Sequence, residues 1–151
     1  MAALVPDPMA ADGIAGFAAR IRRGETTIAA TLAAYLERIA ALDGRLGAFE
    51  HVAAEPALAV AQALDKLLAA GTDLGPLMGV PVAVKDIVAT EGMPTTAGSN
   101  VDVADLIGPE GAFVRSLRRA GCVILGKVKT VEFAAGGTGI NYVRGTPWNP
   151  W

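Results

Sequence analysis

The chain has very few of the residues that build the commonest nucleophilic and metal sites. Among its 151 residues are one cysteine, Cys122, and one histidine, His51. A single cysteine excludes a disulfide within the chain, and one histidine with one cysteine is too few for a zinc site. Only two serines, Ser99 and Ser116, are present. A triad of serine, histidine and acid would therefore have to use His51 with one of these two hydroxyl groups.

Neither serine lies in the glycine-flanked turn that presents the nucleophile of many hydrolases. Ser116 falls on the exposed-to-intermediate side of a predicted helix, and Ser99 lies in the loop TTAGSN, which makes it the better candidate. We therefore expect no complete nucleophilic site within these residues. The stretch Gly136-Gly137-Thr138-Gly139 lacks the ending of a phosphate-binding loop. We interpret it as a turn that lets the backbone approach a substrate or another strand.

Excess positive charge and long apolar runs are also absent. The formal net charge is -2, which argues against a broad basic surface for nucleic acid. No apolar run reaches the roughly 20 residues that a membrane helix needs, and no basic segment precedes an apolar one at the N-terminus. Together with the single cysteine, these features predict a cytoplasmic protein that binds neither membrane nor nucleic acid directly.

What the chain does have is alanine, which favours helices that pack closely. Apolar residues make up 52% of the chain, and their spacing in the first half predicts three helices. These cover about residues 14–24, 27–43 and 56–71, with a short extended piece at 48–52 before the third. Thr26 or Thr27 is the expected cap of the second helix. The apolar positions expected to face the core include Ile14, Phe17, Ala18, Ile21, Ile28, Leu32, Tyr35, Leu36, Ile39, Val60, Leu64, Leu67 and Leu68.

The pattern changes at Gly75. Residues 77–84, LMGVPVAV, predict a buried strand with both faces covered, and residues 122–125 a second apolar strand closed by Gly126-Lys127. Between them, a helix over about 110–120 is expected to turn Phe113, Val114 and Leu117 inward. Strand, helix and strand in this order predict a crossover unit. We therefore predict an α/β fold with a mixed sheet covered by helices.

The last ten residues contain Trp148 and Trp151, large apolar side chains that should be buried. No closing element follows them in the sequence. We therefore expect the chain to be the N-terminal portion of a single domain that is incomplete at its C-terminus. In this interpretation about 1–74 form a helical layer, and about 75–151 form the first core strands and the crossover helix.

Lys85 is the sharpest candidate for chemistry, because it ends the first strand, where open α/β sheets place residues that handle ligands. Apolar surroundings disfavour the charged form of an amine, and a neutral lysine can act as a general base or form a Schiff base. The structural alternative is a lysine that extends to the surface and pairs with Asp86. Lys127, after the second strand, has the same two interpretations, with the structural one stronger, and Lys129 is expected to be solvated.

Several segments in order resemble the amidase signature family: GPLMGVPVAVKDIVATEGMPTTAGS, AFVRSLRRAGCVILGK and VEFAAGGTGINYVRGTPWNP, with RIRRGETT and LGAFEHV upstream. The resemblance covers about residues 10–151. It implies a Ser-cisSer-Lys triad, in which the lysine deprotonates a bridging serine that relays the proton from a nucleophilic serine. That serine attacks an amide carbonyl, and water hydrolyses the resulting acyl-enzyme. The resemblance makes Lys85 the catalytic lysine and requires neither a metal nor an organic cofactor.

By the same resemblance, the turn of Ala134, Ala135, Gly136 and Gly137 lines the acyl pocket. In the family, both serines and the oxyanion-hole amides follow the segment matched by Asn149-Pro150, so this chain alone is expected to be inactive. Glu110-Gly111 stands where the family often has Asp-Ala, and Val128-Lys129 where it often has Thr-Asn. These departures concern substrate preference.

Three functions remain open on the sequence. The first is an amidase that acts on linear amides, and the second is the glutaminase subunit of a tRNA-dependent amidotransferase. The third is a non-catalytic fragment that needs its missing C-terminal half. The expected partners are a small amide substrate, the C-terminal remainder of the protein and a second copy of the chain in a homodimer.

Overall fold

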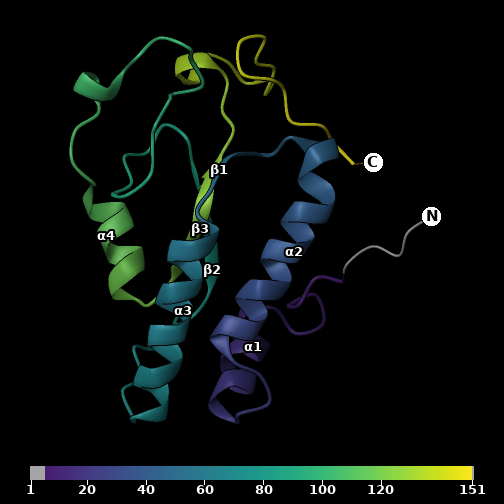
Figure 1. Ribbon diagram of the computed structural model, residues 1–151, viewed down its shortest axis with the longest axis vertical. Helices are drawn as coiled ribbons and strands as arrows, with labels where there is room; N and C mark the ends of the chain where they lie inside the picture. Colours follow the sequence, from purple (N-terminus) through teal and green to yellow (C-terminus); the bar gives the residue numbers. More distant parts are fainter. Residues whose placement is uncertain (1–5, 151) are drawn as a thin grey trace.

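The computed structural model describes residues 6–150, which form helices around a small sheet (Figure 1). In this part of the chain the order of the elements is α1 (Gly13–Arg22), α2 (Ile28–Leu46), β1 (Phe49–Val52), α3 (Ala54–Ala69), β2 (Pro81–Lys85), a 3-10 turn (Ala104–Leu106), α4 (Ala112–Arg119), β3 (Val123–Val128) and a second 3-10 turn (Glu132–Ala134).

The sheet of the described residues has the order β1-β3-β2. β2 runs parallel to β3 and reaches it through α4, whereas β1 pairs with β3 in the antiparallel sense. The predicted crossover unit and mixed α/β sheet are therefore confirmed. Gly126 allows β1 to come this close, because a Cβ atom at position 126 would lie 2.1 Å from the His51 carbonyl oxygen.

Side chains of β3 alternate between two cores, as the pleat of a strand requires. Val123 and Leu125 pack with the helical layer, whose buried members include Phe17, Ile28, Leu32, Ala57, Ala61 and Leu64. Ile124 points to the opposite face, where it packs with Val84 and with Val114 of α4. The sheet thus lies between α1–α3 on one side and α4 on the other (Figure 1).

The start of α2 agrees with the prediction and has a second cap that the sequence does not reveal. The Thr27 hydroxyl accepts a hydrogen bond from the Ala30 amide at 3.0 Å. The Asp65 carboxylate, from α3, accepts from the amides of Ile28 and Ala29 at 2.8 and 3.0 Å. The helix ends later than expected, at Leu46, where Gly47 takes the left-handed conformation with a φ of 57°.

The structure corrects the predicted strands. β2 begins at Pro81, because residues 77–80 form a turn in which Gly79 has a φ of 81°. The expectation that both faces of this strand are covered is wrong, since Ala83 and Lys85 are exposed. β3 does not end before Gly126 but continues to Val128, because β1 and β2 pair with its last residues.

Several large apolar side chains lie outside the predicted core. The buried stripe of α3 consists of Ala57, Ala61 and Leu64, so that Val60 and Leu67 turn outward and are each 41% exposed. The small alanine side chains let α3 approach α2 and β3, which decides the rotation of the helix. Ile14, Phe113 and Trp148 are also exposed rather than buried, and Trp151 lies outside the described residues.

Candidate active site

Lys85 is the last residue of β2, at the same edge of the sheet at which the parallel strand β3 ends. Its side chain is exposed, whereas that of the next residue, Asp86, is fully buried. Among residues 6–150 the Lys85 amine has no hydrogen bond or ion pair. The predicted alternative, a pair between Lys85 and Asp86, is therefore not the arrangement that the structure contains.

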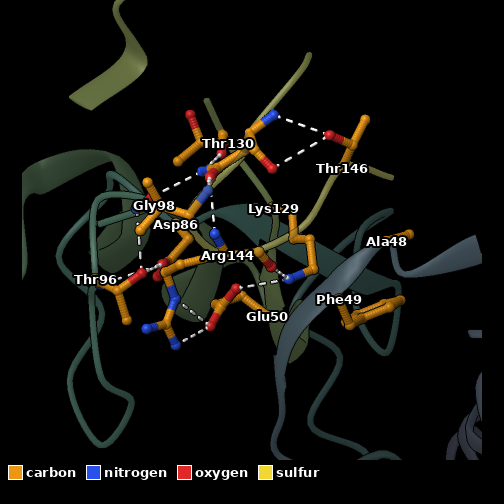
Figure 2. Close-up of polar contacts among 12 residues, drawn as sticks. Ala48, Phe49, Glu50, Asp86, Thr96, Gly98, Lys129, Thr130, Arg144 and Thr146 are labelled. Atoms are coloured by element: carbon orange, nitrogen blue, oxygen red, sulfur yellow. Dashed lines mark hydrogen bonds and ion pairs between the residues drawn. The ribbon is translucent and has the colours of Figure 1, made fainter. Parts of the chain in front are cut away.

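Asp86 instead pairs with Lys127. The favoured structural interpretation of Lys127, a side chain that extends to the surface, is wrong, because the Lys127 side chain is fully buried in this ion pair. The side chains are 1% and 0% exposed, and Lys127 Nζ lies 3.1 Å from Asp86 Oδ1. The other oxygen, Oδ2, accepts hydrogen bonds from the Thr96 amide at 3.1 Å and the Thr96 hydroxyl at 2.5 Å (Figure 2). The Lys127 amine also donates to the Pro94 carbonyl at 3.2 Å and the Thr95 hydroxyl at 2.6 Å.

Three residues other than glycine take positive φ angles near this strand end. They are Ala97, Phe133 and Ala134, with φ angles of 53°, 50° and 58°. The Phe133 amide donates to the Ala97 carbonyl at 2.7 Å, so the two turns touch. Such conformations cost roughly 1–3 kcal/mol each and gather at binding and catalytic sites.

The predicted pocket turn, Ala134 to Gly137, is exposed and begins within the second 3-10 turn. It is joined to the strand that carries Lys85 through backbone hydrogen bonds. Phe133 donates to Ala97, the Ala97 amide donates to the Asp86 carbonyl at 3.0 Å, and the Asp86 amide donates to Val128 at 2.9 Å. These bonds bring residues 85–86, 97 and 133 to one edge of the sheet.

A second polar network, which the sequence did not suggest, surrounds Glu50 of β1 (Figure 2). The Glu50 carboxylate accepts from Lys129 Nζ at 3.0 Å and from Arg144 Nε at 2.8 Å. Burial raises the pKa of Glu50, but the hydrogen bonds from Arg144 and Lys129 outweigh it and lower the pKa below the ordinary 4.5. The expectation that Lys129 is solvated is wrong, because the pairing of residue 129 with Ala48 brings its side chain to Glu50.

Asn141 holds the glycine-rich segment after this network. Its Nδ2 donates to the carbonyls of Gly98 and Thr130 at 2.7 and 2.9 Å. Its Oδ1 accepts from the amides of Val143 and Arg144, both at 2.8 Å. Gly98 is required here, because a Cβ would lie 2.8 Å from the Thr130 carbonyl oxygen. The signal in the sequence was a polar residue inside an otherwise glycine-rich turn.

The alternative nucleophiles are not assembled into a triad. Ser99 is 2% exposed and donates its hydroxyl to Glu132 Oε1 at 2.7 Å, which is a structural contact. Ser116 lies exposed on α4, and His51 lies in β1. Within residues 6–150 no three His, Cys, Asp or Glu side chains are grouped to hold a metal ion.

An open pocket of about 700 Å³ adjoins this edge of the sheet. Its wall is formed largely by residues 89–110, with Arg115 and Arg144, and includes Thr95 and Thr96. Neither Lys85 nor the turn 134–137 belongs to that wall. The pocket is therefore a neighbour of the Lys85 strand end and is separate from it.

The residues described form an α/β fold with a lysine at the end of β2, and comparison with known proteins identifies the family. The amidase family model matches residues 30–151. The A subunit of the glutamyl-tRNA(Gln) amidotransferase of Salinispora arenicola is 47% identical over 137 residues, which are 91% of this chain and 28% of that protein. The 2-amino-5-chloromuconic acid deaminase of Comamonas testosteroni is 42% identical over 91% of this chain and 30% of its own length.

A solved structure shares the fold. The native peptide amidase of Stenotrophomonas maltophilia is 35% identical, with a TM-score of 0.81 over 94% of this chain and 30% of that one. The chain belongs to the amidase signature family. It spans less than a third of the length of these relatives. None of the helices between residues 6 and 150 is long and apolar enough to cross a membrane.

Proposed function

We propose that this chain supplies the lysine of an amide hydrolase, with Lys85 as the general base of a Ser-cisSer-Lys triad. The observation that supports this most is the position of the Lys85 amine. It stands at the end of β2, without a partner among residues 6–150, beside two turns with positive φ angles. A base must be neutral to receive a proton, and in this proposal the remainder of the protein supplies the apolar surroundings that the exposed Lys85 side chain lacks among residues 6–150.

The two serines of the triad belong, in this proposal, to the remainder of the protein, because the chain spans 28% of the length of its Salinispora relative. Lys85 Nζ removes a proton from the bridging serine, which in turn takes the proton of the nucleophilic serine. The nucleophile attacks the amide carbonyl, the amine or ammonia leaves with a proton, and water hydrolyses the acyl-enzyme. Backbone amides outside this chain stabilise the oxyanion, so residues 1–151 alone are inactive.

The exposed turn of Ala134, Ala135, Gly136 and Gly137 is assigned in this proposal to the acyl pocket. Small side chains and glycine leave room for a substrate beside the backbone. Residues 1–74 would then form the helical layer of one domain and residues 75–151 its first strands and crossover helix. We place the reaction in the cytoplasm, with no metal or organic cofactor, and a homodimer remains a further partner to test.

A second candidate is favoured by the 47% identity to the A subunit of a glutamyl-tRNA(Gln) amidotransferase. In that case the amide is that of glutamine, and the ammonia passes to a partner protein. Glutaminase activity and co-purification with a kinase-like subunit would support this function over that of a free-standing amidase. A third candidate, a non-catalytic fragment, predicts no amide hydrolysis even when the rest of the protein is present.

The test replaces Lys85 with Ala in the complete protein that contains this chain. Loss of the base should lower kcat for amide hydrolysis by several orders of magnitude while the protein remains folded, because the Lys85 side chain is exposed. Lys66→Ala, an exposed lysine on α3, is the matched control and should leave kcat unchanged. Near-normal turnover of the Lys85→Ala protein would reject the proposal.

A further inference from the structure

The end of β2 places two consecutive residues in opposite environments. Successive side chains of a strand point to opposite faces, so Lys85 and the following Asp86 diverge. Lys85 is exposed, and the Asp86 side chain is 1% exposed. A buried carboxylate is very costly unless it is paired and hydrogen-bonded. The environment of Asp86 therefore has to be built from neighbouring elements.

Two other segments provide it. β3 provides Lys127, whose amine lies 3.1 Å from Asp86 Oδ1. The loop after β2 provides the amide and hydroxyl of Thr96, which donate to Oδ2. The same lysine donates to Pro94 and Thr95 of that loop. One ion pair thus binds the end of β2, the strand β3 and the loop 94–96 to one another.

The backbone repeats this connection. The Asp86 amide donates to Val128 of β3, and its carbonyl accepts from Ala97. Ala97 in turn accepts from Phe133, and both residues have positive φ angles. These unfavourable conformations persist because surrounding contacts determine them. Displacement of Asp86 would therefore also displace the two turns beside Lys85.

Ion pairs of this kind add little net stability, because the desolvation of both charges offsets their attraction. What they do provide in some proteins is a single defined arrangement of the elements that they join. A single defined arrangement matters next to a catalytic side chain, because a misplacement of that side chain by about 1 Å can lower the reaction rate about a hundredfold.

We infer that the buried Asp86–Lys127 ion pair is the positioning device for the Lys85 base. It holds the end of β2 against β3 and the loop 94–97, so that the Lys85 amine meets the hydroxyl group that it deprotonates. The inference rests on the proposed function of Lys85. Asp86 and Lys127 are positioning residues, because they act through the strand end and touch no reacting atom.

The test compares Asp86→Asn, Lys127→Met and the double variant Asp86→Asn/Lys127→Met in the complete protein. Each single variant leaves a buried charge without its partner and should lower Tm by roughly 5–15 °C. The double variant removes both charges, and its Tm should return most of the way to that of the parent protein. Its kcat for amide hydrolysis should nevertheless stay at least about tenfold below that of the parent, with KM within about twofold.

A matched control is Arg118→Met. It breaks another ion pair with a largely buried carboxylate, Arg118–Glu110, which is also 3.1 Å long but lies at α4. This variant should lose stability and keep its kcat. If the double variant regains kcat together with Tm, or if it never loses kcat, the pair serves folding alone and the inference is overturned.

Lys85→Ala is measured in the same series to separate the two proposals. If Lys85→Ala abolishes turnover and the double variant keeps it, the base is correct and the positioning role is wrong. If Lys85→Ala keeps turnover, the proposed function itself fails. In a double variant that does not fold well enough for assay, Lys127→Arg serves instead. This substitution keeps the positive charge but replaces the compact ammonium with a planar guanidinium. Its kcat should fall about tenfold while KM is unchanged.

Discussion

Lys85 and Asp86 are neighbours in the chain, yet Asp86 forms its ion pair with Lys127 and not with Lys85. The carboxylate at the strand end is therefore already neutralised by a buried amine. As a result, the exposed amine of Lys85 has no partner among residues 6–150.

Gly126 should not tolerate a side chain. A Cβ at this position would lie 2.1 Å from the His51 carbonyl oxygen, so Gly126→Ala has to push β1 away from β3. We expect a loss of about 1–3 kcal/mol in the free energy of unfolding, measured by urea titration. Gly44→Ala is the control, because Gly44 lies inside α2 with nothing within 4 Å of the added methyl. It should stabilise the protein by about 0.5–1 kcal/mol. Equal effects of the two substitutions would contradict the close approach of β1.

The adjacent residues Ala97 and Gly98 should respond in opposite ways. Both have positive φ angles, of 53° and 70°. Ala97→Gly relieves the strain of a left-handed alanine, so the free energy of unfolding should stay constant or rise by up to about 1 kcal/mol. Gly98→Ala adds both strain and a contact of 2.8 Å with the Thr130 carbonyl oxygen, and should cost more than about 2 kcal/mol. Thermal unfolding of the two variants measures these changes in stability. A Gly98→Ala protein as stable as the parent would count against the tight turn.

Glu50 should make stability depend on acid pH. Because its pKa is lowered in the folded chain, the unfolded chain binds the proton first as the pH falls. The contribution of Glu50 is therefore complete above its ordinary pKa of 4.5 and is lost as the pH drops through the lower folded value. At pH 7, Glu50→Gln should be less stable by about 2 kcal/mol, and the difference should shrink toward pH 3. A difference that is constant from pH 7 to pH 3 would refute the role of the charged pair.

Asn141 should be hard to replace. Its amide group makes four hydrogen bonds with backbone groups, which no other side chain of this size can reproduce. Asn141→Asp loses two donors toward the carbonyls of Gly98 and Thr130, and we expect faster amide hydrogen exchange at Val143 and Arg144. Asn100→Asp is the control, because that residue is exposed and touches only Arg144 in the described contacts. Unchanged protection in Asn141→Asp would argue that the segment is held elsewhere.

Local patterns in the sequence predicted the elements well. Thr27 caps α2 as expected, Gly71 follows α3, and the crossover from β2 through α4 to β3 is present. These features depend on residues close in sequence. On α3, Leu64 is buried and Leu68 packs against the core as predicted, but Val60 and Leu67 turn outward. They outweigh the alanines on a hydrophobicity scale, whereas packing favours the small side chains.

The site was predictable to a smaller extent. Lys85 stood out because it ends an apolar run, but the same argument could not say which lysine pairs with Asp86. That choice depends on the register between β2 and β3 and on the loop 94–96, which are distant in sequence. The network of Glu50 with Arg144 joins residues still farther apart and left no local signal.

The pairing of Phe49 with Val128 also constrains how the chain folds. β1 and the inner face of α3 cannot be covered until β3 has been synthesised, because Val123 and Leu125 complete the core of the helical layer. The N-terminal helices are therefore not an independent folding unit. Contacts this distant in sequence slow folding and keep apolar surface exposed during synthesis. A ribosome-bound chain that ends before residue 123 should consequently be far more sensitive to protease than one that ends after residue 128.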